Sequence, residues 1–238
     1  MKRTENLKTL ILVFVMAVFP GFLFAQYTFG VKAGANFANL TGSSVENNSM
    51  IVGYNFGGLF NYSMEDVISG PFGEIFSLQI ELYGETKGTE SDYLFTNPDT
   101  LLTGVEQNFT YITIPVLAKF TFGDPDMLQF YFNAGFFGSS LFGLKIDGEV
   151  KRDHDDEAAT DRRKYREEYA GFDMGVLAGV GANFPLNDHW AVFVDGRYAM
   201  GLTNIGEFKS AQDIPEEQLE DVKTTTIGAS AGILYRLQ

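Results

Sequence analysis

The segment Phe172-Asp-Met-Gly-Val-Leu-Ala-Gly-Val-Gly-Ala-Asn-Phe184 carries an apolar residue at every even position. Its odd positions are mostly Asp, Gly and Asn. Side chains of a β-strand point to opposite faces in turn, so this two-residue period predicts a strand with one apolar and one polar face. A helix has 3.6 residues per turn and cannot produce the pattern.

The same alternation recurs along the chain and predicts eight strands. They cover residues 27–37, 52–62, 76–83, 111–122, 128–136, 172–184, 190–200 and 226–237. Long connections alternate with short turns, as in an antiparallel outer-membrane β-barrel whose short turns face the periplasm. A further hairpin starting at residues 93–95 would make the barrel ten-stranded. Pro115 lies inside the fourth strand, and we expect a bulge or local break there because proline cannot donate to a ladder.

The composition agrees with such a barrel. The chain has 238 residues, 45% of them hydrophobic, with 23 Phe, 26 Gly, no Cys and a formal net charge of -14. The absence of Cys excludes disulfide scaffolds, thiolate metal sites and cysteine nucleophiles. The acidic balance argues against a nucleic-acid partner. Beyond residue 25 no apolar run is long enough for a membrane-spanning helix, so a membrane protein of this sequence must be a barrel.

Residues 1–25 predict an export signal. They hold three basic residues near the start, the apolar run 10–19, and Ala25 before the expected cleavage site. Pro20-Gly21 would interrupt the alternative, an uncleaved anchor. We expect a signal peptide at 1–25 and a barrel at 26–238 in the cell outer membrane. The signal carries a net charge of +2, so the mature chain would carry -16.

Aromatic residues gather on the apolar faces, at the strand ends nearest the short turns. Aromatic side chains favour the interface between membrane and water. We therefore predict a periplasmic aromatic girdle of Tyr27, Phe60, Phe76, Phe120, Phe132, Phe184, Trp190 and Tyr235.

Charged residues of both signs lie on the polar faces. Eight strands leave an interior that side chains can fill, and buried charges need partners. We predict an interior charge network of Lys32, Glu81, Lys119, Asp173, Asp195, Arg197 and Arg236. Lys32 and Arg236 should lie on neighbouring strands, because the last strand must close on the first. The alternative is a charged conduit, although Tyr83, Tyr131 and Leu177 would also occupy the lumen.

Four segments carry a family resemblance. They include Gly30-Val-Lys-Ala-Gly-Ala-Asn-Phe37 and Tyr111-Ile-Thr-Ile-Pro-Val-Leu-Ala-Lys-Phe120, with residues 78–88 and 197–205 as the other two. In this order they resemble the PorT-like outer-membrane β-barrel proteins, often labelled "porin family". The resemblance implies an outer-membrane barrel of a Gram-negative bacterium and, from a PorT-type member, a link to protein secretion. The chain departs from the family pattern at Ile80, where many members carry proline, and in lacking a terminal aromatic residue.

The sequence contains few residues suited to catalysis or metal binding. Its two histidines are His154, in the charged segment 145–168, and His189, in a predicted short turn. Neither suits a catalytic triad or a metal-binding histidine site near the outer leaflet. Segment 145–168 could supply oxygen ligands to a cation, but a solvated loop of mixed charge is favoured. We therefore predict no catalytic residue, no cofactor, no metal site and no enzymatic activity.

The predicted function follows from the architecture. The barrel would have a structural or surface-interaction role through its outer loops, as a monomer in the lipid bilayer. Partners of the loops could be lipopolysaccharide or a surface protein. The alternatives are an accessory component of a protein secretion machine and a narrow channel.

Overall fold

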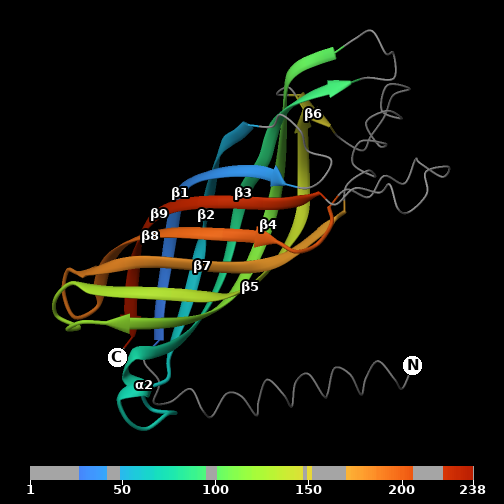
Figure 1. Ribbon diagram of the computed structural model, residues 1–238. Helices are drawn as coiled ribbons and strands as arrows, with labels where there is room; N and C mark the ends of the chain where they lie inside the picture. Colours follow the sequence, from blue (N-terminus) through green and yellow to red (C-terminus); the bar gives the residue numbers. More distant parts are fainter. Residues whose placement is uncertain are drawn as a thin grey trace, which may run out of the picture.

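The computed structural model describes residues 27–41, 49–94, 101–146, 149–151, 170–205 and 222–237. These residues form a closed antiparallel β-barrel (Figure 1). Its strands are β1 (Tyr27–Thr41), β2 (Ser49–Ser63), β3 (Phe76–Leu94), β4 (Leu101–Phe122), β5 (Gln129–Ile146), β7 (Phe172–Pro185), β8 (Trp190–Gly201) and β9 (Lys223–Leu237). Each pairs with the next, and β9 pairs with β1. The short strand β6 (Glu149–Lys151) pairs with β5. The predicted eight-stranded barrel is confirmed.

Strands β3 and β4 extend beyond their predicted limits. Tyr93 pairs with Leu102 and Leu94 with Leu101, so the two strands form one long hairpin. The ten-stranded alternative, which needed a separate hairpin here, is therefore wrong. Positions 84, 86 and 88 are Gly, Thr and Gly. Without large side chains there, the apolar alternation ends although the strand continues.

Pro115 does not produce the expected bulge. The register between β4 and β5 runs without a shift through the pair Pro115↔Phe137. On the other side, pairing with β3 stops at Ile80↔Val116 and resumes at Tyr83↔Thr113 in the same register. The ladder is thus interrupted opposite Pro115, which has no N–H to donate, while the strand itself stays continuous.

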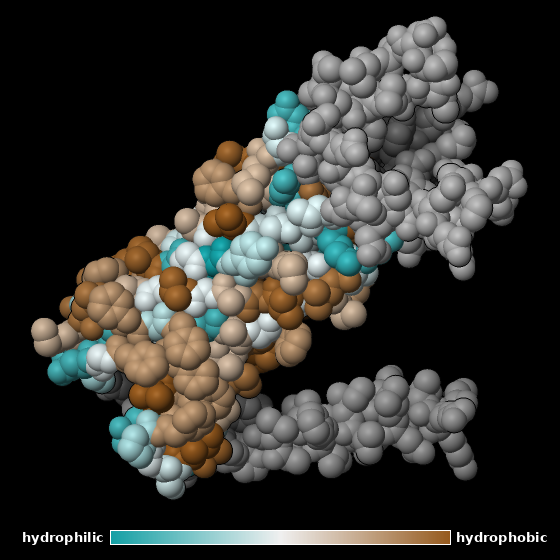
Figure 2. Space-filling view, viewed as in Figure 1, coloured by the Kyte–Doolittle hydropathy of each residue, from teal (hydrophilic) through white to brown (hydrophobic). Residues whose placement is uncertain are grey.

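The outer wall of the barrel is apolar. Every strand of the barrel exposes large apolar side chains, among them Phe29, Phe56, Leu82, Ile114, Phe136, Val180, Val194 and Ile233. On the face drawn in Figure 2, hydrophobic residues cover much of the barrel, and hydrophilic residues gather at its lower left edge. A soluble monomer rarely exposes a continuous apolar area of this extent, whereas a wall in contact with lipid requires it. Within the described residues, no helix has the length and hydropathy to cross a membrane.

Three short connections, at residues 64–75, 123–128 and 186–189, lie at one end of the barrel, here called the short-turn end. The first of them contains helix α2 (Pro71–Ile75). Phe72 of this helix packs against Phe76 and Phe120, with ring centroids 5.3 and 6.0 Å apart. The helix thereby extends the outer aromatic surface beyond the strands.

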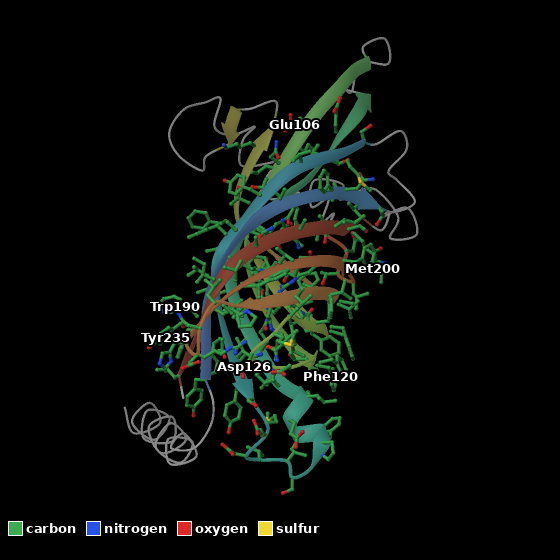
Figure 3. The ribbon with its side chains drawn as sticks, turned by 90° about the vertical axis from the view of Figure 1, so that its left-hand side faces the viewer. Glu106, Phe120, Asp126, Trp190, Met200 and Tyr235 are labelled. Carbon is green, nitrogen blue, oxygen red and sulfur yellow. The ribbon has the colours of Figure 1, made fainter. Side chains whose placement is uncertain are left out.

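Several of the predicted girdle residues contact one another toward the short-turn end. Figure 3 shows Trp190, Tyr235 and Phe120 toward this end and Glu106 toward the other. Ring centroids are 4.7 Å apart for Phe120 and Phe132 and 4.8 Å apart for Trp190 and Tyr235. Similar contacts join Tyr27 to Phe60 and Phe76 to Phe120. That this belt marks a membrane interface stays a prediction.

Candidate functional site

The Glu81 cluster occupies the middle of the barrel. Glu81 is 1% exposed, and its carboxylate accepts hydrogen bonds from Lys32 Nζ at 2.7 Å and Gln79 Nε2 at 2.5 Å. Both terminal nitrogens of Arg197 also donate to it, each at 2.7 Å. Arg197 Nε donates to Asp195 Oδ2 at 2.8 Å. A bidentate contact between guanidinium and carboxylate is among the strongest hydrogen-bonded ion pairs in proteins. The cluster therefore links β1, β3 and β8.

A glycine on β2 lets Lys32 of β1 reach Glu81 of β3. Gly57 lies between them, opposite Lys32 on one side and Tyr83 on the other. A Cβ atom at Gly57 would lie 2.3 Å from both the Leu82 carbonyl oxygen and Tyr83 Cβ. The interior therefore has no room for a side chain at this position. The aliphatic chain of Lys32 passes Gly57 and brings its ammonium group to Glu81.

We expect Gly57→Val to lower the free energy of unfolding by about 1–3 kcal/mol, because overpacking a filled interior forces its neighbours to move. The matched control is Gly58→Val on the same strand. A Cβ atom at Gly58 would meet only the Gly30 carbonyl oxygen, at 3.6 Å, so its effect should stay within about 0.5 kcal/mol. Urea-driven unfolding from lipid vesicles measures both. Equal losses would show that the interior is looser than described.

A second group, the Lys87 cluster, lies further from the short-turn end. Lys87 Nζ is 3.2 Å from Glu85 Oε1 and 3.7 Å from Asp173 Oδ2. Thr113 donates to Glu85 at 2.6 Å, and Thr224 donates to Asp173 at 2.7 Å. Sequence reasoning placed Asp173 inside but missed Glu85 and Lys87. Their signal was the run of polar residues at odd positions, which continues along β3 to Thr89.

Lys119 and Arg236 join neither cluster. The Lys119 ammonium lies over the Tyr131 ring, 4.0 Å from its centroid. Arg236 donates to Gln129 Oε1 at 3.1 Å and to the Pro125 carbonyl at 3.4 Å. In the part of the chain that the structure describes, no carboxylate lies within 4.0 Å of either cation.

The seven predicted interior charges are therefore divided. Lys32, Glu81, Asp195 and Arg197 meet in the Glu81 cluster, and Asp173 belongs to the Lys87 cluster. Arg236 pairs in register with Thr28, so it does lie on the strand next to that of Lys32. Lys119 and Arg236 are near the short-turn ends of β4 and β9, and neither lies within 4.0 Å of a carboxylate of the two clusters.

Apolar side chains fill the lumen on both sides of the charged clusters. One group lies toward the loop end and consists of Leu40, Phe109, Tyr111, Leu141, Leu144, Ala170, Ile205 and Val222. Another lies toward the short turns and consists of Leu59, Ala191, Phe193 and Leu234. Between them, beside Lys32 and Arg197, is a cavity of about 20 Å³, enough for about one water molecule.

His189 is the one histidine among the described residues. Among them, no group of three or more His, Asp or Glu side chains is arranged to hold a metal ion. His189 lies in the turn before β8, where its Nδ1 is 3.3 Å from the Arg236 carbonyl oxygen and its ring packs on Tyr235. His154 and most of segment 145–168 lie outside the described residues.

A family model agrees with this architecture. Residues 24–207 match a family model described as outer membrane protein beta-barrel domain. The chain is also similar to solved structures: Ail of Yersinia pestis in complex with the heparin analogue sucrose octasulfate (12% identity, 90% of this chain, 100% of that chain, TM-score 0.38), OprG of Pseudomonas aeruginosa (11%, 90%, 96%, 0.45) and Neisserial surface protein A (12%, 86%, 95%, 0.43). No curated protein sequence matches it. Similarities of this size transfer no ligand or partner to this chain.

Proposed function

Because the chain belongs to the outer membrane protein beta-barrel domain family, we propose that it is a non-conducting barrel of the cell outer membrane with a structural or surface-interaction role. The observation that carries this proposal is the Glu81 cluster across the lumen. Lys32, Glu81 and Arg197 are at most 9% exposed and are joined by contacts of 2.7 Å. The barrel would act as a rigid scaffold that presents its outer loops at the cell surface.

The energetics of the lumen support a closed interior. A solute passing the Glu81 cluster would have to separate buried ion pairs, which costs several kcal/mol for each uncompensated charge. It would then meet the apolar group around Phe109 and Tyr111 at the loop end. An eight-stranded barrel is also just wide enough for its own side chains. These features favour a plugged interior over a narrow channel.

The proposed partners follow from this role. The apolar wall contacts the lipid bilayer, and lipopolysaccharide or a surface protein would meet the outer loops, including the charged segment 145–168. We propose a monomer with no enzymatic activity. The cleaved signal at residues 1–25 belongs to the same proposal, as the route to the outer membrane. Deletion of each outer loop, followed by adhesion or lipopolysaccharide-binding assays on cells, tests the surface role.

In planar bilayers, the purified protein is expected to give no steady conductance, because charged and apolar side chains fill its lumen. Heat-modifiable migration on a denaturing gel would show that the sample is a folded barrel. An open porin, reconstituted in parallel, controls for successful insertion. A steady, large conductance from folded protein would instead establish a channel.

The second candidate function is an accessory role in a protein secretion machine. It is favoured by the resemblance of residues 30–37, 78–88, 111–120 and 197–205 to PorT-like proteins. Crosslinking in intact cells separates it from the first proposal. Capture of a secretion-machine component from the periplasmic side would support the accessory role, and its absence would support the surface role.

A further inference from the structure

The interior cations are paired unevenly along the barrel. Lys32, Lys87 and Arg197 each have a carboxylate within 3.7 Å. Lys119 and Arg236 have none within 4.0 Å among the described residues. These two cations line the same cavity at the short-turn end, together with the carboxylates of Glu65 and Glu74.

This cavity, the periplasmic vestibule, has a volume of about 340 Å³. Its lining includes Lys119, Arg236, Asn183, Glu65 and Glu74. In outer-membrane barrels the short turns face the periplasm, so a ligand would enter from that side. The volume is at the lower limit of small-molecule sites, about 300 Å³, and suits the end of a short peptide.

The buried ammonium group of Lys119 in the vestibule lining favours a negatively charged ligand. Lys119 is 6% exposed, and an ammonium group buried without a counter-ion is costly. The Asn183 side-chain oxygen is buried and unpaired. Lys119 can supply charge and a hydrogen bond to an anionic group, and the Asn183 oxygen can accept a hydrogen bond from a donor group of the same ligand.

Arg236 contributes a second, oriented cation. Its guanidinium is held by the neutral oxygens of Gln129 and Pro125, at 3.1 and 3.4 Å. Both partners are neutral, and the carboxylate of Asp126 attracts the guanidinium from beyond 4.0 Å. A planar guanidinium can engage a carboxylate through two parallel hydrogen bonds, a geometry that a lysine cannot offer.

The opening of the vestibule has the opposite charge. Glu65 and Glu74 line it and are exposed. A multiply charged anion would be repelled by them, whereas a zwitterion satisfies both ends. We propose that the periplasmic vestibule binds the free carboxylate end of a zwitterionic peptide, with the carboxylate at Lys119 and Arg236 and the amino group toward Glu65 and Glu74. Capture of a terminal carboxylate is an established mode of peptide recognition.

Calorimetric titration of the full chain in lipid nanodiscs tests this proposal, with trialanine and its C-terminal amide as probes. We expect the free acid to bind at least about tenfold more tightly, because charged hydrogen bonds to the carboxylate are lost in the amide. Lys119→Met should weaken binding of the acid by about tenfold or more. Lys223→Met is the matched control. It removes a cation at the end of β9 that lies away from Arg236 and the vestibule, so it should leave the affinity unchanged.

Equal affinities for the acid and the amide, or an unchanged affinity in Lys119→Met, would overturn the proposal. Tighter binding of inorganic phosphate than of trialanine would also overturn it, in favour of a simple anion site. Heat-modifiable migration shows whether each variant has folded. If Lys119→Met does not fold, Arg236→Gln and the comparison of acid with amide on the unmodified chain decide the matter. None of these readouts depends on conductance or on the outer loops.

Discussion

Replacing Glu81 by leucine is expected to lower the free energy of unfolding by about 3–5 kcal/mol, the usual effect of removing one partner of a buried ion pair. Glu81 is the carboxylate that both Lys32 and Arg197 contact at 2.7 Å. Its loss leaves Lys32 buried with no ion-pair partner and leaves Arg197 with Asp195 alone. Urea titration of the protein in lipid vesicles, followed by heat-modifiable migration, measures the change.

Glu90→Leu is the control for this variant. Glu90 lies on the same strand but is exposed, so its replacement should change the free energy of unfolding by no more than about 0.5 kcal/mol. The two variants remove the same charge and differ in burial. Similar small effects for both would mean that the Glu81 cluster does not stabilise the barrel.

Val180→Arg is expected to lower the free energy of unfolding by about 2–4 kcal/mol, as for arginine facing lipid near the middle of a bilayer. Val180 is 64% exposed on the outer face of β7, well away from both ends of the strand. The same urea titration measures the loss. Its cause is transfer of a charged group into hydrocarbon, since the side chain has ample space.

Leu186→Arg is the matched control on the same hairpin. Leu186 is 65% exposed, almost the same fraction as Val180, but it lies in the turn after β7. At the membrane surface an arginine costs about 0–1 kcal/mol. An equal and small effect at both positions would contradict a lipid-facing wall and would favour a barrel surrounded by water.

The sequence was enough to predict which side chains of the expected strands form the apolar outer surface and which face the lumen. Phe29, Phe136 and Val180 were assigned to the apolar face by their two-residue period, and all three are exposed on the outside. Lys32 and Glu81 were assigned to the opposite face, and both are buried. This assignment succeeds because strand geometry is local: alternate side chains point to opposite faces wherever the strand lies.

The extent of the strands was harder to predict. Glu85 and Lys87 were missed because the predicted third strand ended at residue 83, where large apolar residues stop alternating. The ladder nevertheless continues, since β4 supplies the paired backbone groups up to Leu94. At Pro115 the expected bulge is absent, and the break is confined to the ladder with β3. Interruption of one ladder does not bend a strand that the neighbouring strand β5 holds in register.

The sequence by itself determined that this protein is a barrel with an apolar outside and a charged, filled inside. Only the tertiary structure decided which inward charges meet. Lys32 and Glu81 are on strands separated by β2, and their contact depends on barrel closure, strand tilt and the missing side chain of Gly57. The same closure leaves Lys119 and Arg236 in the periplasmic vestibule, with no described carboxylate within 4.0 Å of either cation. Alternation is a property of neighbours in the chain, whereas pairing across a lumen depends on where distant strands come to lie.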